Sequence, residues 1–94
     1  MKVRTSLDAE EDIQEVFDYI ARDSIRNANA VADRIFQAID DLADFGGRGR
    51  KGTVRGTLER VVARTGCVLI YRIEENEVVI LRVWRSARGV PRPA

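Results

Sequence analysis

The chain has 94 residues, of which 45% are hydrophobic and 33% charged, and its formal net charge is +1. This length supports one domain with a single core, and this composition excludes low-complexity disorder. The longest apolar run, residues 67–71, is far shorter than the roughly 20 residues of a transmembrane helix. Residues 1–12 lack the apolar core of a signal peptide. We therefore predict one cytoplasmic domain, residues 1–94, that makes no contact with a membrane.

Ligands for a metal ion are scarce in this sequence. It has no histidine and one cysteine, Cys67, so we predict no metal site, no cofactor and no internal disulfide. Cys67 lies in an apolar run, which is typical of a small core residue rather than of a nucleophile.

The small net charge hides a strong asymmetry along the chain. Residues 1–45 hold five Lys/Arg and eleven Asp/Glu, a net charge of −6, whereas residues 46–94 hold eleven Lys/Arg and four Asp/Glu, a net charge of +7. A field divided in this way attracts an acidic partner or a polyanion to one side only.

The acidic half predicts a short strand and two helices. The strand is expected at residues 2–5, and Thr5 or Ser6 caps the helix that follows. After a break at residues 22–24, a second amphipathic helix runs from about residue 25 to residue 43. So short a link predicts an antiparallel helical hairpin over residues 5–45. The first helix carries one apolar stripe, formed by Ile13, Val16, Phe17 and Ile20.

A basic, glycine-rich segment, GGRGRKGTVRG, occupies residues 46–56. A phosphate-binding P-loop would follow a strand and end in Gly-Lys-Ser/Thr, whereas here Lys51 precedes Gly52 and the segment follows a helix. We therefore predict a basic rim that contacts a partner. The alternative is a solvated connector whose charges aid solubility.

The rest of the chain predicts an antiparallel meander over residues 57–86 and a tail at residues 87–94. β-Branched and aromatic residues enrich the segments 58–64, 67–73 and 78–85, which short turns separate. The order of elements is β-α-α-β-β-β. The predicted fold class is therefore α+β, with a short N-terminal strand and the two-helix hairpin packed on one face of an antiparallel sheet.

Strand periodicity divides the side chains between the two faces of this sheet. Val79, Leu81 and Val83 are predicted to face the helices, so that Arg82 and Trp84 face away. The open face is then rich in arginine, which binds phosphates and carboxylates through two hydrogen bonds. Trp84 either stacks on a base or fills an edge of the core. We predict a partner-binding surface formed by Arg50, Lys51, Arg60, Arg64, Arg72, Arg82, Trp84, Arg85 and Arg88.

Several short motifs, taken together, resemble the RelE/ParE superfamily of bacterial toxins from type II toxin–antitoxin modules. AEEDIQEVFDYIA at residues 9–21 resembles the first helix of that family. Each of the other motifs is short, but they follow in the family's order over nearly the whole chain. They are Gly49-Arg50 after the second helix, Gly56-Thr57-x-Glu59 before the meander, IYRI at residues 70–73, ILRV at residues 80–83, and Ala87-Arg88 with Pro91 at the end.

The resemblance implies two different mechanisms on one fold. RelE-type members are metal-independent endoribonucleases that cut mRNA in the ribosomal A site, whereas ParE-type members poison DNA gyrase. Both are neutralised by a cognate antitoxin whose C-terminal segment wraps the toxin. The implied partners are therefore an antitoxin, in a toxin–antitoxin hetero-oligomer, and either DNA gyrase or the ribosome with its mRNA.

The sequence offers few groups that could transfer protons in an endoribonuclease. Cleavage by the 2′-OH needs a base, an acid and cations. Arg85 stands where many relatives have histidine, Tyr71 is predicted to lie in the core, and Tyr19 lies away from the arginines. We therefore expect a ParE-like toxin, with a RelE-like mRNA interferase as the alternative and a plain nucleic-acid-binding module as a third hypothesis. The catalytic candidates of an interferase are Lys51, Glu59, Arg60, Arg82 and Arg85.

Overall fold

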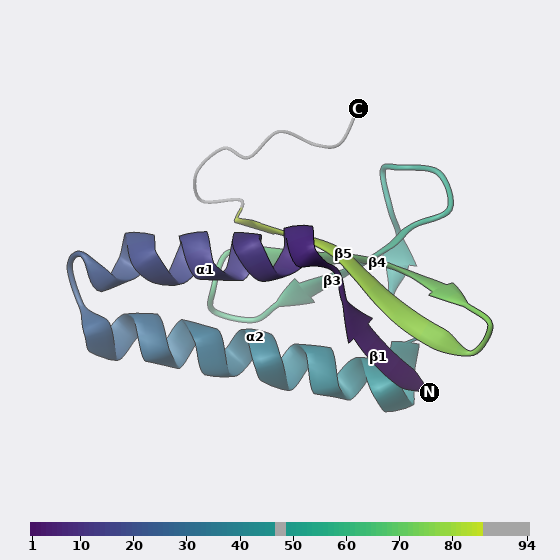
Figure 1. Cartoon of the computed structure of the whole chain (residues 1–94), viewed down its shortest axis with the longest axis horizontal. Helices are drawn as coiled ribbons and strands as arrows, with labels where there is room; N and C mark the ends of the chain where they lie inside the picture. Colours follow the sequence, from purple (N-terminus) through teal and green to yellow (C-terminus); the bar gives the residue numbers. More distant parts are fainter. Residues whose placement is uncertain (47–48, 86–94) are drawn as a thin grey trace.

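Two helices lie side by side along one face of a five-stranded sheet (Figure 1). The computed structural model describes residues 1–46 and 49–85. This part of the chain confirms the predicted α+β architecture, in which a helical hairpin covers a sheet. Its elements are β1 (Lys2–Thr5), α1 (Leu7–Ala21), α2 (Ile25–Phe45), β2 (Arg50–Lys51), β3 (Leu58–Val62), β4 (Cys67–Glu74) and β5 (Glu77–Arg85).

Serine caps fix the start of both helices. The hydroxyl oxygen of Ser6 accepts from the N–H of Ala9 at 3.1 Å and donates to the carbonyl of Leu81 at 3.0 Å. The cap of α1 therefore also attaches the helix to β5. The Ser24 hydroxyl accepts from the N–H of Asn27 at 3.1 Å at the start of α2, so the predicted break between the helices is confirmed. Within the described chain, neither helix combines the length and the apolar character that crossing a bilayer demands.

The sheet has the strand order β1-β5-β4-β3-β2. Strands β3, β4 and β5 form the predicted antiparallel meander. β1 lies parallel to β5, with Lys2 opposite Glu77. β2 lies inside the segment predicted as a basic loop, and its pairing with β3 is limited to Arg50 opposite Glu59 and Lys51 opposite Leu58.

Tyr71 occupies the core between the sheet and the helices. Like Leu42 of α2 and Leu69 of β4, it is 0% exposed. Its hydroxyl donates to the carbonyl of Gly46 at 2.6 Å, which satisfies a polar group that would be costly to bury alone. Cys67 is also 0% exposed, so the predicted core positions of Tyr71 and Cys67 are both confirmed.

A β-bulge interrupts the alternation of side chains along β5. Tyr71 of β4 lies opposite Ile80, but its neighbour Ile70 lies opposite Arg82. Leu81 is therefore the extra residue of the bulge, and the alternation restarts after it.

The bulge changes which residues of β5 face the helices. The core cluster contains Val78 and Ile80 before the bulge and Val83 after it. The prediction that Val79 and Leu81 face the helices is wrong, because strict alternation leaves no place for an extra residue. The prediction for Val83 is confirmed.

Candidate functional site

Residues 50–57, called the basic loop from here on, are anchored on one carboxylate, that of Glu59 in β3. Arg50 donates to Oε1 of Glu59 from Nε and Nη2, at 3.3 and 3.1 Å. Thr53 donates to Oε2 from its backbone N–H and its hydroxyl, at 3.2 and 2.9 Å. Because Glu59 is only 5% exposed, donors from the loop occupy both oxygens of a buried carboxylate.

These contacts determine the protonation of Glu59. Burial favours the neutral acid, but the hydrogen bonds from Thr53 and Arg50 outweigh it and hold the pKa of Glu59 below its ordinary value. The carboxylate is therefore charged at neutral pH and is a weak base. Glu59, a candidate for proton transfer, instead acts as the structural support of the basic loop.

Tyr71 supports the segment that leads from α2 into β2. Burial raises the pKa of Tyr71, although nearby Gly49 and Arg60 favour the ionised form. A Cβ atom on Gly49 would overlap the Tyr71 hydroxyl, so only glycine fits between α2 and the basic loop at this position. The phenol thus stays protonated and helps to hold the backbone that leads into β2.

Cationic side chains remain exposed at the outer part of the basic loop. Lys51 and Arg55 both point into solvent. A depression of about 400 Å³ adjoins Lys51 and is lined by Arg50, Lys51, Gly52, Thr53 and Glu59. The loop therefore presents positive charge on a backbone that Glu59 and Thr53 hold in place.

Arg60 does not lie on the open face of the sheet. Its Nη2 atom is 3.4 Å from Oδ2 of Asp41 in α2. Leu58 and Val62 pack toward the core, and Arg60 shares their face because it lies between them in the alternation. Val61, which is 53% exposed, occupies the open face instead. The predicted alternation of side chains along β3 is confirmed, but its faces were assigned the wrong way round: Arg60 lies on the helix side and Val61 on the open side.

Arg82 forms an ion pair with α1. Its Nε and Nη2 atoms donate to the two carboxylate oxygens of Asp12, at 2.8 and 3.0 Å. The backbone N–H of Val83 donates to the same carboxylate at 2.9 Å. Asp12 is 8% exposed, so this contact attaches α1 to β5 through two parallel hydrogen bonds from the Nε–Nη2 edge of Arg82.

Arg85 also turns toward the helices. Its guanidinium carbon lies 4.6 Å from the ring centroid of Tyr19 in α1, which is a cation–π distance. Arg85 lies opposite Cys67, a core residue, and so shares its face of the sheet. Its Nε and Nη1 atoms are buried and have no hydrogen-bond partner in the part of the chain that the structure describes.

The open face carries mixed charge. Arg72 lies on it and binds Glu74, with 2.7 Å between Nε and Oε2. Arg4 of β1 forms weaker ion pairs with Glu74 and Glu77, at 3.7 and 3.3 Å. Trp84 is half-buried opposite Val68. The predicted placement of Arg82 and Trp84 on the open face is confirmed, because they lie opposite Ile70 and Val68. The prediction that arginines stud this face is otherwise wrong: Arg60 and Arg85 lie on the helix side, Arg82 pairs with Asp12 of α1, and acidic residues accompany Arg72.

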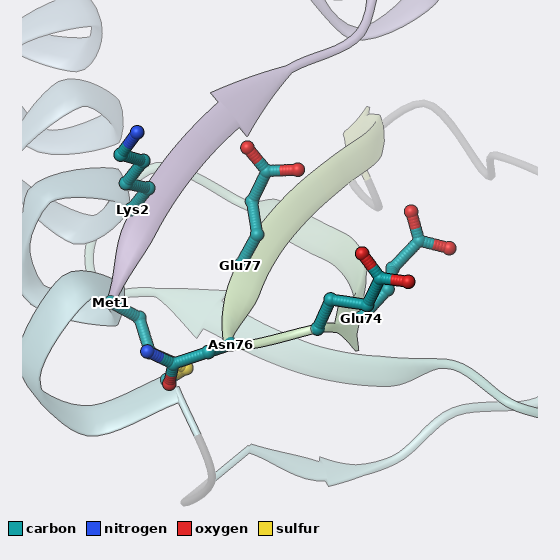
Figure 2. A pocket seen from close by; sticks show the side chains of 6 residues that line it. Met1, Lys2, Glu74, Asn76 and Glu77 are labelled. Carbon is teal, nitrogen blue, oxygen red and sulfur yellow. The ribbon is translucent and has the colours of Figure 1, made fainter.

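An acidic hollow marks the end of the sheet where the chain begins. Figure 2 shows Lys2, Glu74 and Glu77 around it, close to Met1 and Asn76. The hollow measures about 770 Å³ and is also lined by Glu75. Among the described residues, no group of three or more His, Cys, Asp or Glu side chains is placed to bind a metal ion.

The remaining candidates lie at turns or beyond the described residues. Arg64 is exposed in the β3–β4 turn, where its φ is +62°. Arg88 lies outside the described residues. The structure therefore brings Arg50 and Lys51 together in the basic loop, and Arg60 and Arg64 together beside α2. It separates these two groups from Arg72, Arg82 and Arg85.

Sequence reasoning missed the acidic counterions of these arginines. Asp12 stands between Ala9 and Val16 at the three- and four-residue spacing of buried positions in α1. A carboxylate at such a position signals a buried cation partner. Asp41 gave no comparable signal, because it lies at the margin of the apolar face of α2.

The chain is similar to known toxins in sequence and in fold. The sequence profile of the family described as "ParE toxin of type II toxin-antitoxin system, parDE" matches residues 3–90. A curated protein of Sinorhizobium fredii (strain NBRC 101917 / NGR234), named "Putative toxin Y4kP", is 33% identical over 90 residues, which are 96% of this chain and 93% of the relative.

Solved structures agree on the fold. A chain of the chromosomal ParDE toxin–antitoxin system of P. aeruginosa superposes with a TM-score of 0.83 at 22% identity, covering 90% of this chain and 95% of the other. A chain of the Mycobacterium tuberculosis RelBE2 toxin–antitoxin complex gives a TM-score of 0.58 at 29% identity, with coverages of 89% and 88%. The YoeB–YefM complex of Staphylococcus aureus gives 0.57 at 16% identity, with coverages of 88% and 93%.

The fold and the sequence match together define a type II toxin of the RelE/ParE superfamily. Within it, the chain belongs to the ParE toxin family of type II toxin–antitoxin systems.

Proposed function

We propose that this chain inhibits DNA gyrase by protein–protein contact and that a cognate antitoxin neutralises it. One observation favours a toxin that acts by binding over one that cleaves RNA: the Glu59 carboxylate is charged and fully engaged in hydrogen bonds. RNA cleavage needs a base that can take up a proton near neutral pH. Glu59 is held as a weak base by Arg50 and Thr53, so it supports the loop and does not suit that task.

The Tyr71 phenol, a second group that could move protons, is also engaged. It is buried, burial raises its pKa, and it donates to the carbonyl of Gly46 at 2.6 Å. Lys51 is exposed to solvent rather than buried among the arginines.

The basic loop is the surface that we assign to the target. Lys51 and Arg55 are exposed there, and Glu59 holds the backbone beneath them. A rigid, cationic projection binds with a small loss of conformational entropy and suits an acidic patch on a protein. Arg50, Arg64, Arg72, Trp84 and Arg88 remain predicted partner contacts, whereas Arg60, Arg82 and Arg85 would have to exchange internal contacts in order to bind.

A supercoiling assay tests the proposal. Purified toxin at micromolar concentration is added to gyrase and relaxed plasmid, and both supercoiling and covalent cleavage complexes are measured. We expect less supercoiling and more cleavage complex, and both effects should disappear when the antitoxin is added first. Undisturbed supercoiling at saturating toxin would rule out gyrase as the target.

A RelE-like mRNA interferase is the alternative function. The observation that favours it is Arg85, whose buried Nε and Nη1 atoms have no hydrogen-bond partner among the described residues and could hold a phosphate. Primer extension on mRNA after toxin induction distinguishes the two. Cleavage in the ribosomal A site, absent from an Arg85→Gln variant, would establish the interferase.

A further inference from the structure

Helix α2 carries a second apolar stripe, which is not part of the core. Its buried face is formed by Ala28, Ile35, Ala38, Ile39 and Leu42. Ile25 and Phe36 lie off that face and are 60% and 52% exposed, and Ala32 and Ala43 are partly exposed. Intervals of seven, four and seven residues are close to whole helical turns, so these four side chains form one stripe along the helix. Because α2 runs along one margin of the molecule, a second molecule can contact the stripe (Figure 1).

The charges of α2 are the reverse of those that its own dipole favours. Arg26 lies in the first turn, which holds no acidic residue, and Asp44 lies in the last turn, which holds no basic residue. A helix dipole instead favours acids at the N-terminus and bases at the C-terminus. Arg26, Asp40 and Asp44 are exposed, and none of them forms an ion pair within residues 1–46 and 49–85. A second helix of the same kind, lying antiparallel, would supply counterions at both ends.

The apolar stripe is complementary in size to an antiparallel copy of itself. A two-fold axis level with position 34 pairs residues that lie equally far from that position along the helix. Phe36 and Ala32 each lie two residues from it, so the phenyl ring of one copy meets the methyl group of the other. Ile25 and Ala43 each lie nine residues from it and also pair a large side chain with a small one. Packing therefore favours this register over its neighbours.

The same register brings opposite charges together. Arg26, Asp33, Asp40 and Asp44 follow at intervals of seven, seven and four residues, so they form a row beside the stripe. Because the axis is perpendicular to both helices, this row lies on the same side of the contact in both copies. Arg26 is then level with position 42 of the other copy, between Asp40 and Asp44. Asp33 opposes the pairing, because the axis brings the two copies of this exposed carboxylate close together.

We propose that two copies of this chain associate through an antiparallel, two-fold contact between their α2 helices. The contact is independent of the proposed inhibition of gyrase, since it uses no residue of the basic loop. One face of a single helix buries less area than the interfaces of stable dimers, so the dimer is weak and forms only as the concentration rises. Phe36 lies next to the axis and is supplied by both copies, which makes it the main contributor to affinity.

Sedimentation equilibrium of the purified full-length chain, from about 1 µM to about 1 mM, tests the contact. We expect a reversible monomer–dimer equilibrium for the wild type. Phe36→Ser should weaken it about tenfold or more, because one substitution removes two side chains from the contact. Leu7→Ser, which removes a 72% exposed side chain of α1, is the matched control and should dimerise like the wild type. A wild type that stays monomeric throughout, or equal effects of the two substitutions, would overturn the proposal.

A charge exchange tests the register while leaving the apolar stripe intact. Arg26→Asp, and separately Asp40→Arg/Asp44→Arg, should each weaken self-association about tenfold, because like charges then meet at both ends. A mixture of the two variants should recover a dimer that contains one copy of each, since every such contact again joins opposite charges. Asp33→Asn removes the repulsion beside the axis and should strengthen the dimer about twofold or more. A mixture that associates no better than either variant alone would overturn the proposed contact.

Discussion

The carboxylate of Asp12 accepts three hydrogen bonds from β5: two from the Arg82 guanidinium and one from the backbone N–H of Val83. This contact joins the first helix to the last strand across 70 residues of sequence. The side chain of Asp12 is only 10% exposed, whereas that of Arg82 is 46% exposed. If the Asp12 carboxylate is removed, water can therefore hydrate the Arg82 guanidinium, but it cannot reach the backbone N–H of Val83.

Asp12→Ala should lower the free energy of unfolding by about 2 kcal/mol, because it leaves the buried N–H of Val83 without an acceptor. Asp12→Asn keeps one acceptor oxygen and should lose about half as much. Urea denaturation followed by circular dichroism measures both values. Asp8→Asn, which changes an exposed carboxylate one turn earlier in α1, is the matched control and should stay close to wild type. Equal losses in Asp8→Asn and Asp12→Ala would contradict this account.

Gly49 and Tyr71 should be energetically coupled. Gly49→Ala places a methyl group where the Tyr71 hydroxyl lies, so we expect a loss of about 2 kcal/mol in the free energy of unfolding. Tyr71→Phe should lose about 1 kcal/mol with the hydrogen bond to Gly46. In the double variant the missing hydroxyl relieves part of the overlap, so its loss should be smaller than the sum of the two. Strictly additive losses would show that the two sites are independent.

Local patterns were enough to predict most of this fold. The apolar stripes of α1 and α2, the Ser24 break and the β-rich segments are each encoded within a few neighbouring residues. The core position of Tyr71 followed from the alternation along β4, which the bulge leaves intact because its extra residue, Leu81, lies in β5.

The distribution of the arginines could not be predicted in the same way. An extra residue at Leu81 is decided by how β5 meets β4 and α1, not by its own sequence. Arg60 lies on the core side because Leu58 and Val62 on either side of it pack toward the helices, and there it meets Asp41 of α2. Tertiary contacts of this kind leave no periodic signal, so the sequence overstated the charge of the open face.

The stability of the protein should depend on pH through Glu59. Its pKa in the folded state lies below the ordinary value of 4.5, so the unfolded chain binds its proton first as the pH falls. Glu59 therefore contributes stability that is fully present above about pH 4.5 and is lost as the pH drops through the folded-state pKa. Glu59→Gln should be less stable at pH 7 and lose less stability between pH 5 and pH 3, which denaturation curves at each pH can measure.

A control separates this effect from general acid denaturation. Glu11→Gln removes an exposed carboxylate and should leave the pH dependence of unfolding close to that of the wild type. The Glu59→Gln variant should also be cut faster by trypsin after Lys51 and Arg55, because the basic loop loses its anchor. Unchanged cleavage at both sites would mean that Glu59 does not hold the loop.

Charge reversal in the basic loop should weaken the contact with the target. Lys51 and Arg55 are exposed in the loop. Lys51→Glu/Arg55→Glu should therefore weaken gyrase inhibition by about tenfold or more, because like charges then meet the acidic target surface. Arg26→Glu, an exposed charge reversal in α2, is the matched control and should inhibit like the wild type. Equal inhibition by the double variant and the wild type in the supercoiling assay would mean that the basic loop does not contact the target.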